Sequence, residues 1–458
     1  MSDSAAAACL FPGFHGDAAP DWLKGLLGQG LGGVVLFGHN IRDPEQVAAL
    51  TASLRAERPE LIVATDEEGG DVTRLETAGG SSFPGNLALG AIDDPSLTRR
   101  VAAAIGGELA AVGIDLDLAP VADVLVDPAS AIVGVRSFGS DPQLVARQVA
   151  AFVEGLQSVG VAACAKHFPG HGETVADSHL ELPSSDASLD VLRERALPPF
   201  AAAVKAGARA VMTAHIQFDA FGEEPATWNA AVVELLRTEL GFDGVVMTDA
   251  LEMQGAGGPE GMEHSAVRAL AAGADALCLG ADMTPELVEG VHAAIVSAVG
   301  DGRLAEERLA EAARRVAELA AWTSPRPLAD REAGAEAARR ALRVEGDPAV
   351  GENALVIELW PEPTIAAGAA DHGLGELLGV ETIRLHEGDP LPPAGDRPLV
   401  LALRDAHRHA WQRELVVPGA VVVETGVPAW RPADVQAYVA TYGAGRANLA
   451  AAAEALRS

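Results

Sequence analysis

The sequence predicts an α/β protein in which a (β/α)8 barrel of the TIM type is followed by a smaller α/β domain. Three observations lead to this fold class. Short apolar, β-branched runs alternate with longer amphipathic stretches rich in Ala and Leu through the first part of the chain. Most of the amphipathic stretches end in glycine, as helices commonly do. The pattern then changes at a proline-containing linker that begins near Ser324.

Eight apolar runs are the predicted strands of the barrel. Three of the stretches between them open with Asp-Pro, at Asp43, Asp94 and Asp141, where aspartate suits the N-cap of a helix and proline its first turn. A doubly wound open sheet is the alternative, but no G-x-G-x-x-G follows the first strand and no G-x-x-x-x-G-K-[ST] occurs, so its nucleotide-binding versions lose support. The strands are expected at Ala8–Phe11, Gly33–Phe37, Leu61–Asp66, Ile114–Ala119, Val161–His167, Ala210–His215, Gly244–Asp249 and Ala274–Gly280.

The residues after the linker predict a second domain. Strand-like runs at Ala354–Trp360, Pro398–Ala406 and Ala420–Trp430 are separated by helical stretches. We therefore divide the chain into a barrel domain at residues 1–323 and a small α/β domain at residues 324–458. The smaller domain contains no paired carboxylates, metal-spaced histidines or phosphate loop, so we expect the chemistry in the barrel.

Charge and cysteine content limit the partners and the compartment. The formal net charge of −32 at pH 7 disfavours binding to nucleic acid or to an anionic membrane. Cys9, Cys164 and Cys278 lie in apolar runs without a CxxC partner, which is typical of reduced thiols. The N-terminus has no basic region before a long apolar core, and no apolar run is long enough to span a bilayer. We expect a soluble cytoplasmic protein.

Ionisable side chains follow the apolar runs at four predicted strand ends: Asp66, Lys166 with His167, His215, and Asp249. In a parallel barrel the working residues lie at the carboxyl ends of the strands. Each residue alone could be a helix cap or a hydrogen-bonded strand-end residue. Four such ends together favour a functional site, because a buried charge is costly unless it is paired or used. For this reason His215 is included among the substrate-binding candidates.

The segment KHFPGHGETVADSHLELP, from Lys166 to Pro183, follows the fifth predicted strand. Its glycines and prolines break regular structure and let the backbone approach a ligand closely. Asp177 and His179 are two residues apart, so the carboxylate could reach one ring nitrogen and orient the imidazole. This segment is therefore expected to be a proton-transfer loop at the mouth of the barrel.

A zinc site is the alternative reading of the same segment, because His167 and His171 have HxxxH spacing. Two histidines with this spacing share one face only in a helix. Pro169 and Gly170 stand between them and oppose a helix. We therefore expect neither a metal nor another cofactor.

The same segment resembles the signature of glycoside hydrolase family 3, in particular its bacterial β-N-acetylglucosaminidase branch. The resemblance covers residues 32–280 approximately and implies a (β/α)8-like barrel, and longer members of the branch carry a second α/β domain. Further matches occur in the family's order at Asp66–Leu75, Phe83–Gly90, Asp115–Val124, Ile132–Pro142 and Gly244–Met253.

The resemblance implies a retaining exo-β-N-acetylglucosaminidase, which acts on chitooligosaccharides or on cell-wall fragments such as those of peptidoglycan recycling. Asp249 would be the nucleophile, His179 the general acid and base, and Asp177 the carboxylate that orients His179. An imidazole with a pKa near ~6.5 can serve both as acid and as base at neutral pH. The positions that match the family's sugar-binding residues are Asp66, Arg74, Arg136, Lys166 and His167.

Two other functions stay open on the sequence. A neutral imidazole repels anions less than a carboxylate does, so a phosphorylase that uses phosphate as acceptor is a close rival. A catalytically silent sugar-binding protein is the other, although the joint presence of Asp249, His179 and Asp177 argues against it. Many relatives have Gln and Arg where this chain has Glu67 and Asp71. Two added acids near the mouth would favour neutral chitooligosaccharides over anionic muropeptides.

Overall fold

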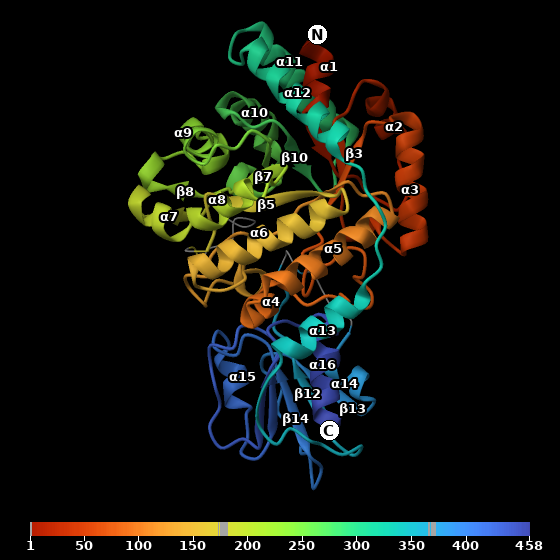
Figure 1. Ribbon diagram of the computed structural model, residues 1–458, viewed down its shortest axis with the longest axis vertical. Helices are drawn as coiled ribbons and strands as arrows, with labels where there is room; N and C mark the ends of the chain where they lie inside the picture. The colour runs from red at the N-terminus through yellow and green to blue at the C-terminus, as the bar shows by residue number, and fades with distance from the viewer. Residues whose placement is uncertain (1, 173, 175–181, 365–366, 368–371) are drawn as a thin grey trace.

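The computed structural model describes residues 2–172, 174, 182–364, 367 and 372–458. Figure 1 shows two parts stacked along the long axis, with the N-terminus at the far end of the upper part and the C-terminus in the lower part. The upper part contains the first sheet and its helices. The lower part, residues 331–458, is here named the C-terminal part.

The first part is built on parallel strands that lie where the sequence predicted them. Six of them form a sheet in the order β2-β3-β4-β5-β7-β9, and β1 pairs with β10. A bridge between Met247 and Ala276 joins β9 to β10, and Gly32 N donates to Ala7 O beside β1 and β2. This arrangement is TIM-like. The strands are β1 (Leu10–Pro12), β2 (Gly33–Leu36), β3 (Ile62–Thr65), β4 (Leu116–Asp117), β5 (Ala162–Phe168), β7 (Ala210–Thr213), β9 (Val245–Thr248) and β10 (Leu277–Gly280), and two short strands, β6 (Ser184–Ser185) and β8 (Gln217–Phe218), pair outside this sheet.

Helices cover the outer face of the first sheet (Figure 1). The predicted caps are confirmed: Asp43, Asp94 and Asp141 each accept hydrogen bonds from backbone N–H groups at the start of α3, α5 and α6. Each such cap stabilises its helix by about 1 kcal/mol. The helices of this part are α1 (Ser2–Ala8), α2 (Asp21–Gly28), α3 (Pro44–Glu57), α4 (Asn86–Ile92), α5 (Pro95–Ala111), α6 (Pro142–Ser158), α7 (Leu189–Arg195), α8 (Leu197–Lys205), α9 (Ala230–Glu234), α10 (Gly258–Ala272), α11 (Pro285–Gly300) and α12 (Glu306–Trp322).

Side chains of the first sheet alternate between two apolar clusters, as the two-residue period of a strand requires. One cluster fills the space between strands and helices, and Val34, Val211 and Val246 belong to it. The other cluster lies inside the curved sheet and includes Val35 and Met212. Every second strand residue therefore points toward the interior that opens at the carboxyl ends.

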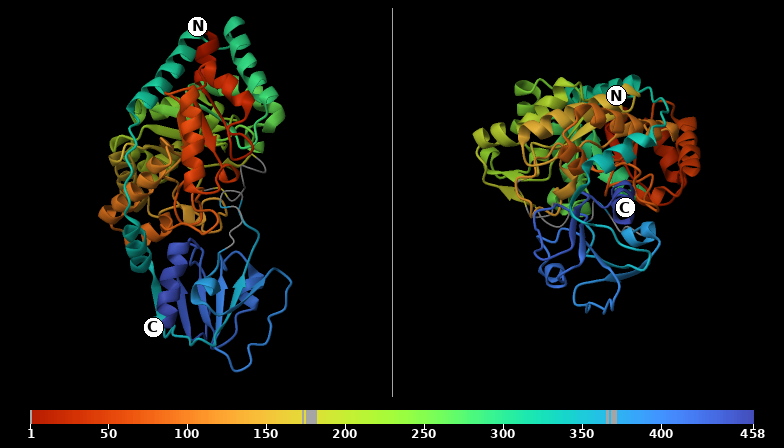
Figure 2. Two further views of the ribbon diagram at one scale, coloured as in Figure 1. Left: turned by 90° about the vertical axis from the view of Figure 1, so that its right-hand side faces the viewer. Right: turned by 60° about the horizontal axis from the view of Figure 1, so that its bottom comes forward.

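The C-terminal part is built on a second sheet in the order β11-β16-β15-β14-β12-β13, parallel except for β11. Three of its strands, β12, β14 and β15, lie in the three predicted strand-like runs. Helices α13 and α16 pack against each other beside this sheet (Figure 2). Its elements are α13 (Arg331–Ala341), β11 (Arg343–Gly346), β12 (Leu355–Leu359), α14 (Leu374–Leu378), β13 (Glu381–Leu385), β14 (Leu399–Leu403), α15 (Ala410–Glu414), β15 (Val421–Glu424), β16 (Ala437–Ala440) and α16 (Arg446–Arg457).

The two parts contact each other through α13 and through loops at the carboxyl ends of both sheets. Helix α13 packs on α4 and α5, and Arg340 lies 2.9 Å from Asp94 at the start of α5. Val427, after β15, packs with Leu87 and Val133 of the first part. The C-terminal part therefore lies beside the loops that follow β3 and β4.

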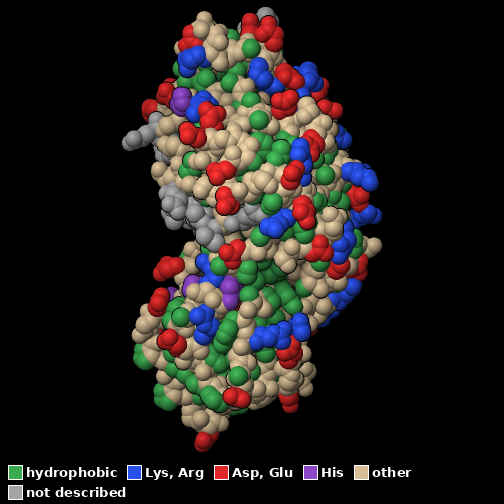
Figure 3. Space-filling view, turned by 90° about the vertical axis from the view of Figure 1, so that its left-hand side faces the viewer, with side chains coloured by type: hydrophobic (Ala, Val, Ile, Leu, Met, Phe, Trp, Pro, Cys, Tyr) green, Lys and Arg blue, Asp and Glu red, His purple; other side chains and the backbone are tan. Residues whose placement is uncertain are grey.

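The surface charge is distributed. Figure 3 shows acidic side chains spread over one face of both parts, interspersed with basic ones, so on this face the net charge of −32 is not gathered in one patch. Among the helices of the described ranges, none has the length and apolar character needed to cross a bilayer.

Candidate active site

A cavity of about 380 Å³ opens at the carboxyl ends of the first sheet. Its apolar lining includes Phe37, Leu118, Ile132 and Met212. Most of the predicted site residues line this one cavity, although they come from distant parts of the sequence. These residues are Asp66, Arg74, Arg136, Lys166, His167 and Asp249.

The strand period explains why Asp66, Lys166 and Asp249 reach the cavity. Asp66 and Asp249 directly follow β3 and β9, and Lys166 lies near the end of β5. In each strand alternate residues point into the interior, and each of the three residues continues that alternation by two positions. Each of these three side chains therefore lies at the inner rim of the sheet, where the apolar core ends. The preceding inward residues are Ile62 and Ala64 in β3, Ala162 and Cys164 in β5, and Val245 and Met247 in β9.

Five charged side chains form a network on one side of the cavity. Lys166 Nζ donates to Asp66 Oδ1 at 2.5 Å and lies 2.9 Å from Glu68 Oε1. Arg136 Nε and Nη2 donate to the two oxygens of Glu68 at 2.9 and 2.7 Å. Arg74 Nη2 lies 3.8 Å from Asp66 Oδ2. The side chains of Lys166 and Glu68 are only 3% and 2% exposed, so the network is held rigidly before any substrate arrives.

Glu68 and Lys166 keep their charges at neutral pH. Burial alone would raise the pKa of Glu68, but the Arg136 guanidinium and the Lys166 ammonium hold it well below its usual range. Burial alone would lower the pKa of Lys166, but Asp66 and Glu68 raise it above its usual value. The cavity thus offers fixed ammonium and guanidinium donors beside a carboxylate acceptor, which is a set suited to sugar hydroxyls.

His167 is oriented by a buried carboxylate. Its Nδ1 lies 2.8 Å from Asp123 Oδ2, and its backbone N donates to Asp123 Oδ1. Asp123 also accepts the backbone N–H of His171 at 2.7 Å, so one carboxylate fixes both ends of this turn. Because Nδ1 is engaged with Asp123, Nε2 is the ring nitrogen that His167 can offer to the cavity.

His171 lies beside His167 with the two rings edge to face, 5.9 Å between centroids. Its Nδ1 is 2.8 Å from Thr174 Oγ1, and burial lowers its pKa to about 4. It is therefore neutral at neutral pH. In both rings of the HxxxH pair, Nδ1 contacts another side chain of the protein, Asp123 for His167 and Thr174 for His171.

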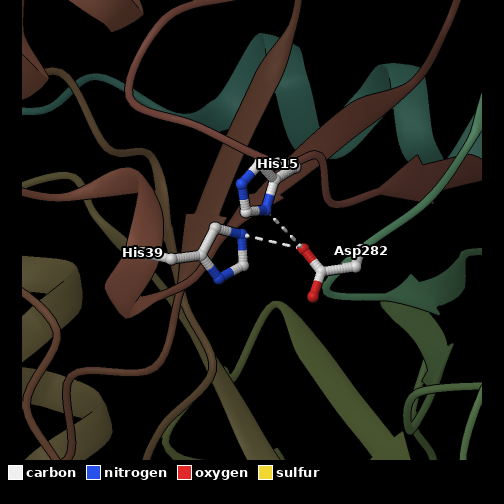
Figure 4. A group of neighbouring side chains, drawn as sticks. All are labelled: His15, His39 and Asp282. Carbon is white, nitrogen blue, oxygen red and sulfur yellow. Dashed lines mark hydrogen bonds and ion pairs between the residues drawn. The ribbon is translucent and has the colours of Figure 1, made fainter.

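In the part of the chain that the structure describes, one group of ionisable side chains is close enough to share a metal ion, and it lies elsewhere on the rim. Figure 4 shows His15 and His39 facing one oxygen of Asp282, with His15 Nδ1 at 3.3 Å and His39 Nε2 at 3.5 Å. The His39 nitrogen also lies 3.0 Å from the carbonyl of Phe14, which uses it as a hydrogen-bonding group. His15 and Asp282 are mostly exposed.

Asp249 follows β9 directly and is half-buried in the cavity wall. Its backbone N donates to Thr213 O of the neighbouring strand at 3.2 Å, and its Oδ1 accepts Ala250 N–H at 2.8 Å. These contacts fix the Asp249 carboxylate at the inner rim of the sheet, where it lines the cavity. Such a carboxylate can act as a nucleophile.

His215 is not among the described residues that line the cavity. Its Nδ1 lies 2.7 Å from Thr227 Oγ1 and its Nε2 lies 3.0 Å from Ala250 O, so it anchors the backbone next to Asp249. It is fully buried. Asp177 and His179 lie outside the described residues, and their roles stay predictions.

Residues 17–319 match the family model described as "Glycosyl hydrolase family 3 N terminal domain". The chain belongs to glycosyl hydrolase family 3. A beta-hexosaminidase of Neisseria gonorrhoeae (strain ATCC 700825 / FA 1090) is 40% identical over 276 residues, which are 58% of this chain and 76% of the relative. A beta-hexosaminidase of Stenotrophomonas maltophilia (strain K279a) is 38% identical over 313 residues, which are 64% of this chain and 90% of the relative.

A solved family 3 structure is similar over the whole chain. The glycoside hydrolase family 3 beta-N-acetylglucosaminidase from Paenibacillus sp. str. FPU-7 superposes with a TM-score of 0.88 at 32% identity. The match covers 100% of this chain and 96% of that one, so it includes the C-terminal part. The family expected from the sequence is thereby confirmed.

Two residues of this family 3 site were missed by sequence reasoning. Glu68 bridges Lys166 and Arg136, and Asp123 orients His167. Both lie in segments that carried the resemblance, DEEGGDVTRL and DLDLAPVADV. An acidic residue inside an otherwise apolar or glycine-rich segment was the available signal, since such a residue needs a buried partner.

The structure corrects the expectation about Glu67 and Asp71. Neither is among the described residues that line the cavity. Glu67 is buried, and its Oε2 accepts Arg74 N–H and Leu75 N–H at 2.8 and 3.0 Å. Asp71 is paired with Arg404 of the C-terminal part. These two acids therefore do not act on an aglycone in the way that the sequence suggested.

We expect Glu67 to make the folded protein lose stability as the pH rises from about 4.5 to about 7. Burial raises the pKa of Glu67 from 4.5 to about 7, so between these values the unfolded chain releases a proton that the folded chain keeps. The free energy of unfolding should fall by about 3 kcal/mol across this range. The stabilisation that Glu67 gives the folded protein is fully present below pH 4.5. Glu67→Gln removes the titration and keeps the acceptor oxygen.

Denaturant unfolding of the wild type and Glu67→Gln at pH 5 and pH 8 checks this prediction. All other titrating groups are shared, so the difference between the two proteins isolates Glu67. The free energy of unfolding of Glu67→Gln, relative to that of the wild type, should be higher at pH 8 than at pH 5. Parallel pH dependence in the two proteins would contradict it.

Proposed function

We propose that this protein is a retaining exo-β-N-acetylglucosaminidase that releases terminal N-acetylglucosamine from chitooligosaccharides or cell-wall fragments. One observation carries the proposal: the Asp249 carboxylate shares a cavity with the fixed network of Asp66, Glu68, Lys166 and Arg136. The beta-hexosaminidase relatives and the Paenibacillus beta-N-acetylglucosaminidase support the same activity. The volume of the cavity, near the low end for small-molecule pockets, suits one terminal sugar better than a long chain.

The reaction proceeds in two displacements. Asp249 attacks the anomeric carbon, the bond to the leaving oxygen breaks, and His179 gives its proton to that oxygen. Water then attacks the anomeric carbon, the bond to the Asp249 oxygen breaks, and His179 takes the proton from water. Asp177 orients the imidazole throughout. The parts assigned to His179 and Asp177 come from the family resemblance.

The charged network holds the sugar for these steps. Lys166 and Arg74 donate hydrogen bonds to sugar hydroxyls, and Asp66 accepts them. His167, turned by Asp123, adds one ring nitrogen. Because every one of these groups is already paired, the substrate replaces or shares existing hydrogen bonds and the site does not need to reorganise.

Two further points belong to this proposal. We infer that residues 1–323 form one (β/α)8 barrel domain and residues 324–458 a second domain, which is supported by the two separate sheet orders. We also retain the cytoplasm as the location, which is supported by three free, buried cysteines.

Product identification tests the proposal. Chitobiose is digested with and without inorganic phosphate, and N-acetylglucosamine is expected as the product in both cases. A dominant sugar 1-phosphate in the presence of phosphate would overturn hydrolysis. Absence of turnover on both chitobiose and a 4-nitrophenyl N-acetyl-β-glucosaminide would leave a silent sugar-binding protein. A parallel assay with an N-acetylglucosaminyl-anhydromuramyl substrate decides between neutral and cell-wall aglycones.

Replacing His179 with Gln should lower chitobiose turnover at least about 100-fold more than turnover of a 4-nitrophenyl glycoside. The sugar leaving group needs a proton from the acid, whereas 4-nitrophenolate leaves without one. The measurement is the ratio of kcat on the two substrates in variant and wild type. Equal losses on both substrates would argue against His179 as the acid.

A further inference from the structure

We infer that the C-terminal part positions the sugar-binding loop of the first part, through the contact of Arg404 with Asp71. The inference rests on the proposed function, because it concerns the loop at residues 66–75 that carries Asp66, Glu68 and Arg74. Arg404 is not among the described residues that line the cavity, so it is a positioning residue.

The loop makes a tight hairpin between its sugar-binding residues. Glu68 N donates to Val72 O at 3.0 Å, and Val72 N donates back to Gly69 O at 3.3 Å. Gly69 and Gly70 have φ values of 76° and 61°, a region that favours glycine. This turn places Asp71 at the tip and aims it away from the cavity, three residues from both Glu68 and Arg74.

The tip is held by the C-terminal part through two groups on one carboxylate. Arg404 Nη2 donates to Asp71 Oδ2 at 2.5 Å, and Ala444 N donates to Asp71 Oδ1 at 2.7 Å. Arg404 follows β14 and Ala444 follows β16, so the carboxyl ends of two strands of the second sheet meet at this point. The Asp71 side chain is only 3% exposed, and its charge raises the pKa of Arg404.

The backbone around Gly70, next to Asp71, is closely packed by segments of both parts. A Cβ atom on Gly445 would lie 2.8 Å from Gly70 Cα, and a Cβ atom on Gly70 would lie 2.6 Å from Gly85 Cα. Gly70 N also donates to Phe83 O at 2.8 Å. The tip is thus enclosed between a segment of the first part and a segment of the C-terminal part, with no room for a side chain.

Loss of Arg404 leaves a buried carboxylate without its cation, which is strongly unfavourable. Asp71 then gains by moving toward solvent, and the hairpin carries Glu68 and Arg74 with it. The network of Lys166 and Arg136 depends on Glu68, so sugar binding weakens although no cavity residue has changed. A contact that merely joined the two parts would lower thermal stability and leave the kinetics of the folded enzyme unchanged.

The test uses the full chain with three variants: Arg404→Met, the double variant Asp71→Asn/Arg404→Met, and Arg340→Met as matched control. Arg340 also pairs across the two parts, with Asp94 at the start of α5, which lies outside the hairpin in the sequence. KM and kcat are measured on a 4-nitrophenyl N-acetyl-β-glucosaminide well below the melting temperature. Hydrogen exchange of the backbone amides in residues 66–75 is measured in parallel, and it does not depend on activity.

Arg404→Met should raise KM about ten-fold with a smaller loss in kcat, and should speed exchange in residues 66–75. The double variant, which removes the unpaired charge, should recover most of both effects, and it also serves if the single variant does not fold. Unchanged exchange and KM in Arg404→Met, or equal changes in Arg340→Met, would overturn the inference. If the wild type lacks activity but exchange responds as stated, the proposed function fails and the positioning contact stands.

Discussion

Replacing Asp249 with Asn should lower kcat on a 4-nitrophenyl N-acetyl-β-glucosaminide by about 10⁴-fold without unfolding the protein. An amide cannot attack the anomeric carbon, so the first displacement is lost. The fold is expected to survive because the Asn side-chain oxygen can still accept Ala250 N–H, as Asp249 Oδ1 does at 2.8 Å. Steady-state kinetics give the loss, and thermal unfolding confirms that the variant is folded.

Asp243→Asn is the matched control for this variant. Asp243 is exposed and stands just before β9, at the end of the strand opposite to Asp249. The same chemical change there should leave kcat within about two-fold, as surface substitutions usually do. A residual kcat within ten-fold of wild type in Asp249→Asn would remove Asp249 from the role of nucleophile.

The sequence predicted the strands of the first sheet well, because their signal is local. Both faces of a strand in a parallel sheet are buried, so each strand is a nearly continuous apolar run. Here these runs are four to seven residues long and are bounded by glycine and aspartate. In the structure, the two-residue alternation determines which side chains reach the cavity. It also distinguishes His215, because Val211 and Thr213 point outward in β7 and His215 continues on their side, next to Thr227. Alternation was thus a sufficient signal for His215 too.

Other features depend on tertiary partners that no local pattern reveals. Asp123 meets His167 across 44 residues of chain, and Asp71 meets Arg404 across 333 residues. A carboxylate in a glycine-rich loop near the mouth can face the cavity or turn away. Here the positive φ values at Gly69 and Gly70 send Asp71 outward, and only the backbone path of the hairpin determines that direction.

Glu68→Gln should lower kcat/KM by about 10²- to 10³-fold, or about 3–4 kcal/mol, because removing one partner of a buried ion pair leaves an uncompensated charge. Glu68 is the shared anion of Lys166 and Arg136, with contacts of 2.9 and 2.7 Å. Gln is nearly the same size but neutral, and its amide hydrogens would face one of the cations. Lys166 would then rely on Asp66 alone, and the Asp66 carboxylate would be less available to the sugar.

Glu358→Gln provides a control with the same change in a comparable setting. Glu358 lies in β12, is 2% exposed, and its Oε2 accepts from Arg384 Nε at 3.1 Å, but it is not among the described residues of the cavity. It should reduce the free energy of unfolding and leave kcat/KM nearly unchanged. Glu68→Gln should reduce both, because the same charge pair that holds the loop also sets the positions of the groups that bind the sugar. If the two variants lose the same kcat/KM, or if Glu68→Gln stays within two-fold of wild type, Glu68 has a structural role only and sugar recognition must lie with Asp66, Arg74 and His167.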